Sequence, residues 1–294
     1  MNNLGDEMNN YGQVIKEIRV GKGYSQQYVS EKICSQGNYS KFEKGENREI
    51  KFSILKEFLG RLEMSYEEFE YISNNYKMHD RQRIMKKFYN QTYNSENALL
   101  QMIEECSAYL QHNPNDNLIM NIQTVMEGML VLARSSDFIL ASETLSPLWK
   151  DLSQRNTLYL ADIYLLNAIL FVFPISTATE IKEFAFRHID KYNGFQNINK
   201  LKINFLINLS LINIKGKDFE TALHLLNDAI GKCKSEQLFI NLSICYVRKG
   251  VCLNNLHGSN EGFIEKGLTL LQHLEQAELV KMLEKEIKYN LIVK

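Results

Sequence analysis

The sequence predicts an all-α protein, and three observations lead to that fold class. Only three of its 294 residues are proline, and because proline interrupts helices, long helices are expected. Long runs of alternating β-branched and aromatic residues, which would indicate strands, are absent. Apolar residues recur instead at helical spacing along most of the chain. The length suits two domains, which we place at residues 8–73 and 97–294, with a connecting helix over residues 74–96.

Residues 8–73 are predicted to contain five short helices. The first covers residues 11–21 and ends at the sequence GKG, a common helix stop. The second, third and fifth are expected to begin after Ser25, Ser35 and Ser65, whose hydroxyls can cap a helix. The apolar inward faces of the first four helices are Val14, Ile15 and Ile18; Val29 and Ile33; Tyr39 and Phe42; and Phe52, Leu55, Phe58 and Leu59.

Three motifs follow one another in this domain: IKEIRVGKG, YSQQYVSEKICSQGNYSKFEKGE and LKEFLGRLEMSYEEF. With these motifs, residues 11–72 resemble the phage-repressor-like (XRE, or Cro/repressor) helix-turn-helix domain. The resemblance implies that the third helix lies in the DNA major groove. It also implies that Arg19 pairs with Glu43 and braces the first helix against the third. Cys34 stands where the family often has glycine, and cysteine is less suited than glycine to the positive φ expected of that turn.

The polar side of the third helix carries hydrogen-bond groups suited to reading DNA. The major groove displays a distinct donor and acceptor pattern for each base pair, which glutamine can read at adenine and lysine at guanine. Gln36 and Lys41 occupy the family's base-reading positions, and Gly37 would keep the helix close to the groove. The residues expected to face the bases are Gln36, Gly37, Asn38, Ser40 and Lys41. Contacts to phosphates, which position the protein, are expected from Gln26, Ser35, Lys44 and Arg48.

The charge distribution agrees with a nucleic-acid partner. The net charge of the chain is −1, but residues 10–56 hold nine basic and five acidic residues, a local charge of +4. A second basic group lies within the connecting helix, at Lys77, Arg81, Arg83, Lys86 and Lys87. Clustered positive charge is typical of a nucleic-acid binder, although charged runs on helices are more often only solvated faces. The connecting helix would accordingly touch phosphates or remain solvated.

Residues 97–294 are predicted to form helices that repeat in pairs. The clearest pair is NKLKINFLINLSLINIKGKDFETALHLLNDAIGKC, and a second follows in LFINLSICYVRKGVCLNNLHGSNEGFIEKGLTLLQHL. Gly216 and Gly258 fall at equivalent places between the paired helices, Asp218 is expected to open a helix, and Gly267 would allow close packing. The pattern resembles tetratricopeptide-like repeats, although the spacing is longer and the usual tryptophan and proline are missing. It implies an α-solenoid with a concave surface suited to extended partners.

Asparagines recur among apolar residues on the helices expected to line that surface. They are Asn121, Asn167, Asn204, Asn208 and Asn241. Because an asparagine amide offers both donors and an acceptor, it can pair with the backbone of an extended peptide whatever the peptide's side chains are. Neighbouring isoleucine, leucine and phenylalanine residues would receive those side chains. We predict that these five asparagines bind a peptide; the alternative is that they lie at the surface or between helices.

Taken together, the two domains and their connector resemble the Rgg-type transcription regulators of Gram-positive bacteria, within the wider group of peptide-sensing regulators. The resemblance covers the whole chain and depends mainly on the third helix and on the NxxxN spacing followed by GKDFxxAL. It implies a homodimer that binds an inverted-repeat site on double-stranded DNA and is controlled by a short, hydrophobic signalling peptide, as in quorum sensing. The alternative is a helical-repeat adaptor for protein interactions, with an auxiliary N-terminal domain.

Other features argue against further classes of protein. The five cysteines have no CxxC spacing and the six histidines pair with no cysteine at ligand spacing, so no metal and no other cofactor is expected. An enzyme is not expected, because no glycine-rich phosphate loop follows a strand and no nucleophile is accompanied by a base. The sequence has neither the apolar core of a signal peptide nor a run of 18 apolar residues, so we expect no membrane partner and a bacterial cytoplasmic location.

Overall fold

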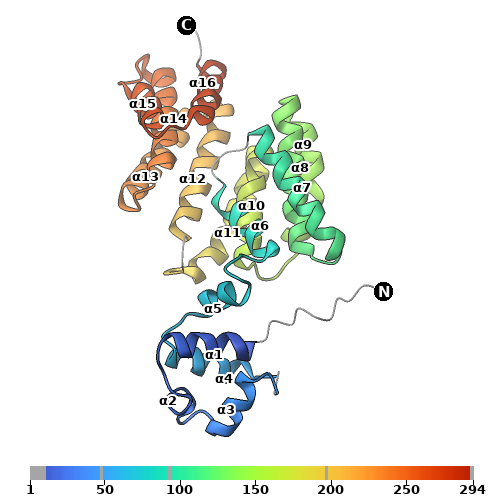
Figure 1. The fold of residues 1–294 in the computed structure, drawn as a ribbon. Helices are drawn as coiled ribbons and strands as arrows, with labels where there is room; N and C mark the ends of the chain where they lie inside the picture. Colours follow the sequence, from blue (N-terminus) through green and yellow to red (C-terminus); the bar gives the residue numbers. More distant parts are fainter. Residues whose placement is uncertain (1–10, 47–48, 92–94, 196–197, 292–294) are drawn as a thin grey trace. The chain divides into compact units, whose positions relative to one another are not determined.

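The computed structural model describes residues 11–46, 49–91, 95–195 and 198–291, and the regular elements of these residues are all helices. The all-α prediction is therefore confirmed for this part of the chain. The chain forms two compact units, Met1–Arg83 and Ile84–Lys294, which follow one another from blue to red in Figure 1. Within the described ranges, no helix combines the length and the apolar content needed to cross a membrane.

The described residues of the first unit up to Ser73 form five helices at the places that the sequence predicts. Ser25, Ser35 and Ser65 each accept a hydrogen bond from the backbone N–H three residues later, at 3.1, 3.3 and 3.1 Å. These bonds satisfy N–H groups that would otherwise lack a partner at the start of a helix. The helices are α1 (Tyr11–Gly21), α2 (Gln26–Ser30), α3 (Gln36–Glu43), α4 (Phe52–Arg61) and α5 (Tyr66–Ser73).

Aromatic side chains occupy the centre of the first unit. Tyr39 and Phe58 are almost fully buried and meet edge to face, with ring centroids 4.8 Å apart. Phe42 also packs against Phe58, at 6.0 Å. Such aromatic pairs add about 0.5–1.5 kcal/mol beyond the burial of their area. The inward face predicted for α3 is thus confirmed, whereas Ile33 follows the end of α2 and is only half-buried.

The turn between α2 and α3 differs from the prediction at one position. The backbone adopts a positive φ of 63° at Lys32, whereas Cys34 lies outside the left-handed region. The expectation for Cys34 is therefore wrong, because the conformation that favours glycine occurs two residues earlier. Cys34 instead packs against the core of the first unit, and this burial raises the pKa of its thiol.

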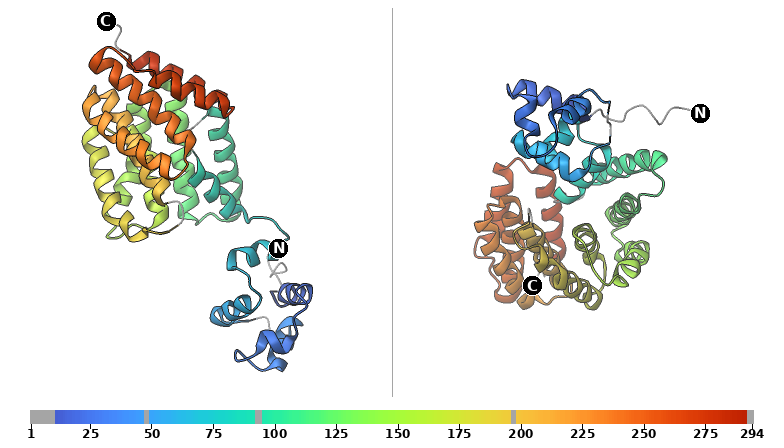
Figure 2. Two further views of the ribbon diagram at one scale, coloured as in Figure 1. Left: turned by 90° about the vertical axis from the view of Figure 1, so that its left-hand side faces the viewer. Right: turned by 90° about the horizontal axis from the view of Figure 1, so that it is seen from below.

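The second unit begins within α6 (Asp80–Asn90) and continues as helices that pack side by side. Seen from below in Figure 2, these helices follow an arc. The helices after α6 are α7 (Glu96–His112), α8 (Asn117–Ser135), α9 (Phe138–Ser153), α10 (Leu160–Ile169), α11 (Ile175–Ile189), α12 (Ile198–Lys215), α13 (Phe219–Ser235), α14 (Phe239–His257), α15 (Phe263–His273) and α16 (Ala277–Asn290). Two short 3₁₀ helices, η1 (Leu170–Val172) and η2 (Asp190–Tyr192), follow α10 and α11.

The helix pairs α12–α13 and α14–α15 have the boundaries expected from their turn residues. Asp218 opens α13, and its carboxylate accepts a hydrogen bond from the backbone N–H of Thr221 at 3.1 Å. Gly258 ends α14 with a φ of 75°, which favours glycine. Gly267 lies so close to α14 that a Cβ added there would stand 2.6 Å from Cγ2 of Val247. The close packing predicted at this glycine is confirmed.

α12 carries apolar residues on two sides, because it lies between two cores. Leu201, Phe205 and Leu209 belong to the core shared with α7–α11. Ile203 and Ile207 belong to the core shared with α13–α16. Both sides of α12 are therefore packed, and its asparagines at positions 204 and 208 lie between these two sets of core residues in the sequence.

The C-terminal half of α6 packs into the second unit. Ile84 is fully buried there and Phe88 is almost so, and Lys87 forms an ion pair with Glu105 of α7. The boundary between the units follows Arg83 and therefore lies inside the helix. The sequence predicts that residues 74–96 form a polar, basic connector. The structure shows instead that α6 is amphipathic and that its apolar side packs into the core of the repeats.

Candidate functional site

α3 is fixed to the rest of the first unit by a buried ion pair. The Arg19 guanidinium donates to both carboxylate oxygens of Glu43, at 2.6 and 2.9 Å, and to the backbone oxygen of Tyr24 at 2.7 Å. Gln26 donates to the same carboxylate at 2.7 Å. Burial alone would raise the pKa of Glu43, but the hydrogen bonds from Arg19 and Gln26 outweigh it and hold that pKa below its usual value. The brace implied by the family resemblance is present.

The opposite side of α3 is exposed and polar. Gln36, Gly37, Asn38 and Lys41 are exposed, and Ser40 is half-buried. All five come from one helix of eight residues, so helix geometry sets their spacing. The space around Gly37 is open, because a Cβ added there would meet no atom within 4 Å. The five residues predicted to read bases therefore lie outside the core, on a helix that the brace holds in place.

The four residues predicted to contact phosphates have different surroundings. Gln26 is half-buried and bonded to Glu43, and Ser35 caps α3, so both also have a structural role. Lys44 directly follows α3 and is exposed. Arg48 lies outside the described residues.

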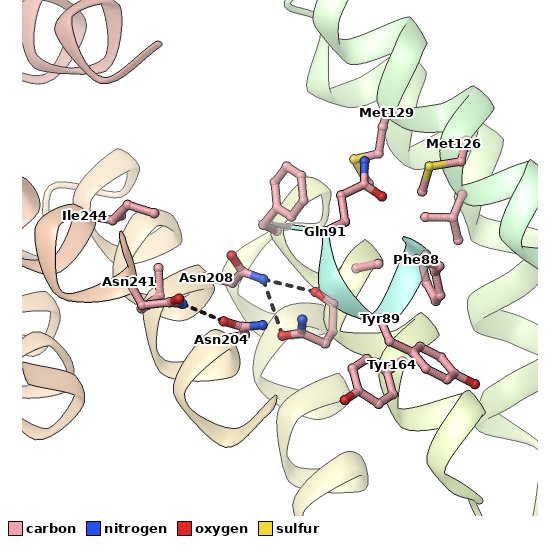
Figure 3. A pocket seen from close by; sticks show the side chains of 15 residues that line it. Phe88, Tyr89, Gln91, Met126, Met129, Tyr164, Asn204, Asn208, Asn241 and Ile244 are labelled. Atoms are coloured by element: carbon pink, nitrogen blue, oxygen red, sulfur yellow. Dashed lines mark hydrogen bonds between the residues drawn. The ribbon is translucent and has the colours of Figure 1, made fainter. Parts of the chain in front are cut away.

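A pocket in the second unit is lined by α6, α8, α10, α12 and α14 (Figure 3). From α8 onward these are alternate helices, which is the arrangement of the inner face of a solenoid. None of the described lining residues is charged, and four of them are asparagines predicted from the sequence. The lining residues are Phe88, Tyr89, Gln91, Val125, Met126, Met129, Tyr164, Asn167, Ala168, Phe171, Asn204, Ile207, Asn208, Asn241 and Ile244.

The four asparagines form two hydrogen-bonded pairs between neighbouring inner helices, drawn as dashed lines in Figure 3. Asn208 Nδ2 donates to the backbone oxygen and to Oδ1 of Asn167, at 3.1 and 3.4 Å. Asn241 Nδ2 donates to Oδ1 of Asn204 at 2.8 Å. In these bonds one member of each pair uses only its oxygens and the other only its N–H groups. Each pair therefore keeps an amide donor and an amide acceptor for a ligand.

Asn121 does not belong to this group. It lies on α8 one turn before Val125, half-buried, and is not among the residues that line the pocket. α8 contributes apolar residues to the lining instead, among them Met126 and Met129. Their flexible thioether side chains can adapt to different occupants.

The residues from α6 were not predicted from the sequence. Phe88 and Tyr89 form an aromatic wall, and Tyr89 stacks on Tyr164 of α10 with ring centroids 4.2 Å apart. The signal was the pairing of Ile84 with Phe88 and of Met85 with Tyr89, four residues apart on one side of a helix. The basic residues between them indicate instead a connecting helix that touches phosphates or remains solvated.

The pocket offers both hydrogen-bond groups and apolar surface to a ligand. Its amide groups can pair with a polar backbone, while its aromatic, methionine and isoleucine residues can receive apolar side chains. Among the described lining residues, none is an aspartate, glutamate, histidine, lysine, serine or cysteine. In the described ranges, no three residues among the histidines, cysteines, aspartates and glutamates cluster to hold a metal ion.

Comparison with known proteins supports both parts of the fold. Residues 15–69 match the family model described as Helix-turn-helix. No curated protein gives a significant sequence match. A proposed transcriptional regulator from Listeria monocytogenes EGD-e has a similar structure, with a TM-score of 0.73 and 15% sequence identity over 96% of this chain and 97% of that one.

Two further solved structures share the fold over nearly their whole length. PlcR from Bacillus thuringiensis, solved in complex with the peptide PapR7 and DNA, has a TM-score of 0.66 and 16% identity, covering 95% of this chain and 99% of its own. The SHP pheromone receptor Rgg2 from Streptococcus dysgalactiae has a TM-score of 0.64 and 17% identity, covering 95% and 99%. The chain therefore has a helix-turn-helix domain followed by helical repeats, in the order of these peptide-sensing regulators.

Proposed function

We propose that this protein is a DNA-binding transcription regulator whose activity is controlled by a short peptide bound in the pocket of the second unit. It acts on DNA in the bacterial cytoplasm and carries out no chemical reaction of its own. The observation that carries the proposal is that one chain contains two candidate sites, one in each unit. One is an exposed polar helix in a helix-turn-helix domain, and the other is an uncharged pocket lined by paired asparagines.

In this proposal α3 enters the major groove, and its exposed residues meet the edges of the bases. Gln36 reads adenine and Lys41 reads guanine, because their side chains have the matching hydrogen-bond groups. Asn38 and Ser40 assist, and Gly37 permits a close approach. The remaining contacts, from Gln26, Ser35, Lys44 and Arg48, go to phosphates and fix the position of the domain.

The amide groups of the pocket suit the backbone of an extended peptide. Such a backbone presents N–H and C=O groups in alternation. Asn167 and Asn204 keep N–H donors for peptide carbonyls, while Asn208 and Asn241 keep oxygens for peptide N–H groups. Because the lining is uncharged, burial of a charged peptide side chain there would lack a compensating partner. The preferred ligand is therefore a peptide with apolar side chains.

A homodimer would place two copies of α3 in successive major grooves, about 34 Å apart, on an inverted-repeat site. The peptide changes DNA binding by favouring one arrangement of the repeats over another. It can do so only to the extent that it binds one arrangement more tightly. PlcR, which was solved with both a peptide and DNA, shares this fold and supports the proposal.

The DNA part is tested with sites selected from random double-stranded DNA. We expect the double variant Gln36→Ala, Lys41→Ala to lose its preference for the selected sites in a fluorescence-anisotropy titration. The control is Lys56→Ala, which removes one positive charge from an exposed position on α4. If the double variant retained full preference for the selected sites, α3 would not be the reading helix.

The peptide part is tested by calorimetric titration with synthetic apolar peptides taken from small secreted open reading frames of the source genome. We expect saturable binding that is lost in the double variant Asn204→Ala, Asn208→Ala. Asn121→Ala is a matched control, because this asparagine lies on α8 outside the pocket. If no peptide bound at micromolar concentration, the repeats would have to be assigned to a protein partner instead.

A further inference from the structure

α6 depends on the second unit for its stability. It has 11 residues, DRQRIMKKFYN, and most of them are polar or charged. Isolated helices shorter than about 12–15 residues are marginal in water, so such a helix needs packing to persist. The packing comes from four apolar residues on one side: Ile84 and Phe88 are buried in the core of the second unit, and Met85 and Tyr89 are partly buried against it.

Two of these four residues also form the wall of the pocket. Phe88 and Tyr89 line it from α6, and Gln91 lines it just beyond the end of the helix. Tyr89 is held by its stacking contact with Tyr164. A ligand in the pocket would therefore cover apolar surface of the residues on which the order of α6 depends.

We propose that occupancy of the pocket stabilises α6, so that the helix order of this segment reports whether the pocket is filled. The inference depends on the proposed function, since it takes the pocket to be the ligand site. Its physical basis is linkage: an occupant that contacts Phe88 and Tyr89 only when α6 is folded and packed favours that state.

α6 spans the boundary between the two units, so its order affects the chain that connects them. Residues 80–83 of the helix belong to the first unit and residues 84–90 to the second. When α6 is ordered, the non-helical chain after α5 is limited to residues 74–79, and when α6 is frayed this non-helical segment is longer. Pocket occupancy thereby sets the length of the non-helical segment that follows α5.

The coupling can be tested by filling the pocket with a side chain. Ala168 lines the pocket four residues after Tyr164, on the same side of α10. In Ala168→Leu the added side chain stands in for part of an occupant of the pocket that Tyr89 also lines. We expect the backbone amides of α6 to exchange with deuterium about three- to tenfold more slowly in the full chain, as followed by mass spectrometry.

Two further variants complete the experiment. Ala108→Leu makes the same substitution at an exposed position of α7 outside the pocket, so exchange in α6 should remain as in the unmodified chain. Ala168→Val adds a smaller side chain to the pocket and should slow deuterium exchange in α6 by a smaller factor. It replaces Ala168→Leu in the experiment if the leucine variant does not fold. Unchanged α6 exchange in a folded Ala168 variant would overturn the inference.

The inference and the proposed function can fail separately. If apolar peptides bind in the calorimetric titration but leave α6 exchange unchanged, the coupling is refuted while the peptide site stands. If no peptide binds but Ala168→Leu slows exchange in α6, the coupling stands and the proposed ligand is refuted.

Discussion

Substitution of Gly37 by alanine should have opposite effects on stability and on DNA binding. Gly37 is an exposed residue in the first turn of α3, with a negative φ and no atom within 4 Å of an added Cβ. Alanine fits there without strain and is the better helix former by about 0.5–1 kcal/mol. For a domain of this size, that gain raises the melting temperature of the first unit by about 2–8 °C.

DNA affinity should fall in the same variant. If α3 lies in the major groove with Gly37 toward the bases, the added methyl group occupies space that the base edges need. We expect the affinity for selected DNA sites to drop by about 5- to 150-fold, which corresponds to about 1–3 kcal/mol. Thermal unfolding and fluorescence anisotropy on the same preparation measure the two effects.

Gly60→Ala is the matched control. Gly60 is an exposed helical glycine on α4 of the same unit, and a Cβ added there also meets no atom within 4 Å. This variant should be stabilised like Gly37→Ala and should bind DNA with unchanged affinity. If Gly37→Ala were stabilised and bound DNA as well as the unmodified chain, the placement of α3 against the bases would be wrong.

Three further predictions concern stability. The depressed pKa of Glu43 contributes stability that is complete above its ordinary pKa of 4.5 and is lost as the pH falls below that value, so denaturant unfolding of Glu43→Gln should show a weaker acid dependence than the unmodified chain. Gly267→Ala places a methyl group against the side chain of Val247 and should destabilise the second unit by about 1–3 kcal/mol in the same assay, whereas equal stability would mean that α15 shifts freely. Glu286→Ala leaves Arg248 buried without its carboxylate partner and should cost about 3–5 kcal/mol, and a loss below 1 kcal/mol would show that the pair is not buried in solution.

Local signals made most of the first unit predictable from its sequence. The capping serines determine where α2, α3 and α5 begin, because each hydroxyl accepts a bond from an N–H group only three residues away. The Arg19–Glu43 brace joins residues that are distant in the sequence, and the family pattern identified it. In the turn between α2 and α3, the position of the positive φ was predicted wrongly. Any of several turn residues can adopt a positive φ, and in the structure Lys32 does so.

The pocket could be predicted only in part. Asn204 and Asn208 are four residues apart, so they lie on one side of a helix whatever the tertiary structure is. Whether Asn121 reaches the same surface depends on how far each helix extends past its neighbours, and the sequence does not encode that directly. The contribution of Tyr89 was missed because the basic residues of α6 concealed an apolar side that only the packing against Tyr164 makes evident.

The most direct test is to measure whether DNA and peptide affect each other's binding equally. The affinity for a selected DNA site is measured with and without a saturating peptide, and the affinity for the peptide is measured with and without DNA. Because linkage is reciprocal, we predict that both affinities change by the same factor. The double variant Asn204→Ala, Asn208→Ala should show no change in DNA affinity on addition of peptide. A peptide that binds the pocket of the unmodified chain and leaves its DNA affinity unchanged would contradict the account.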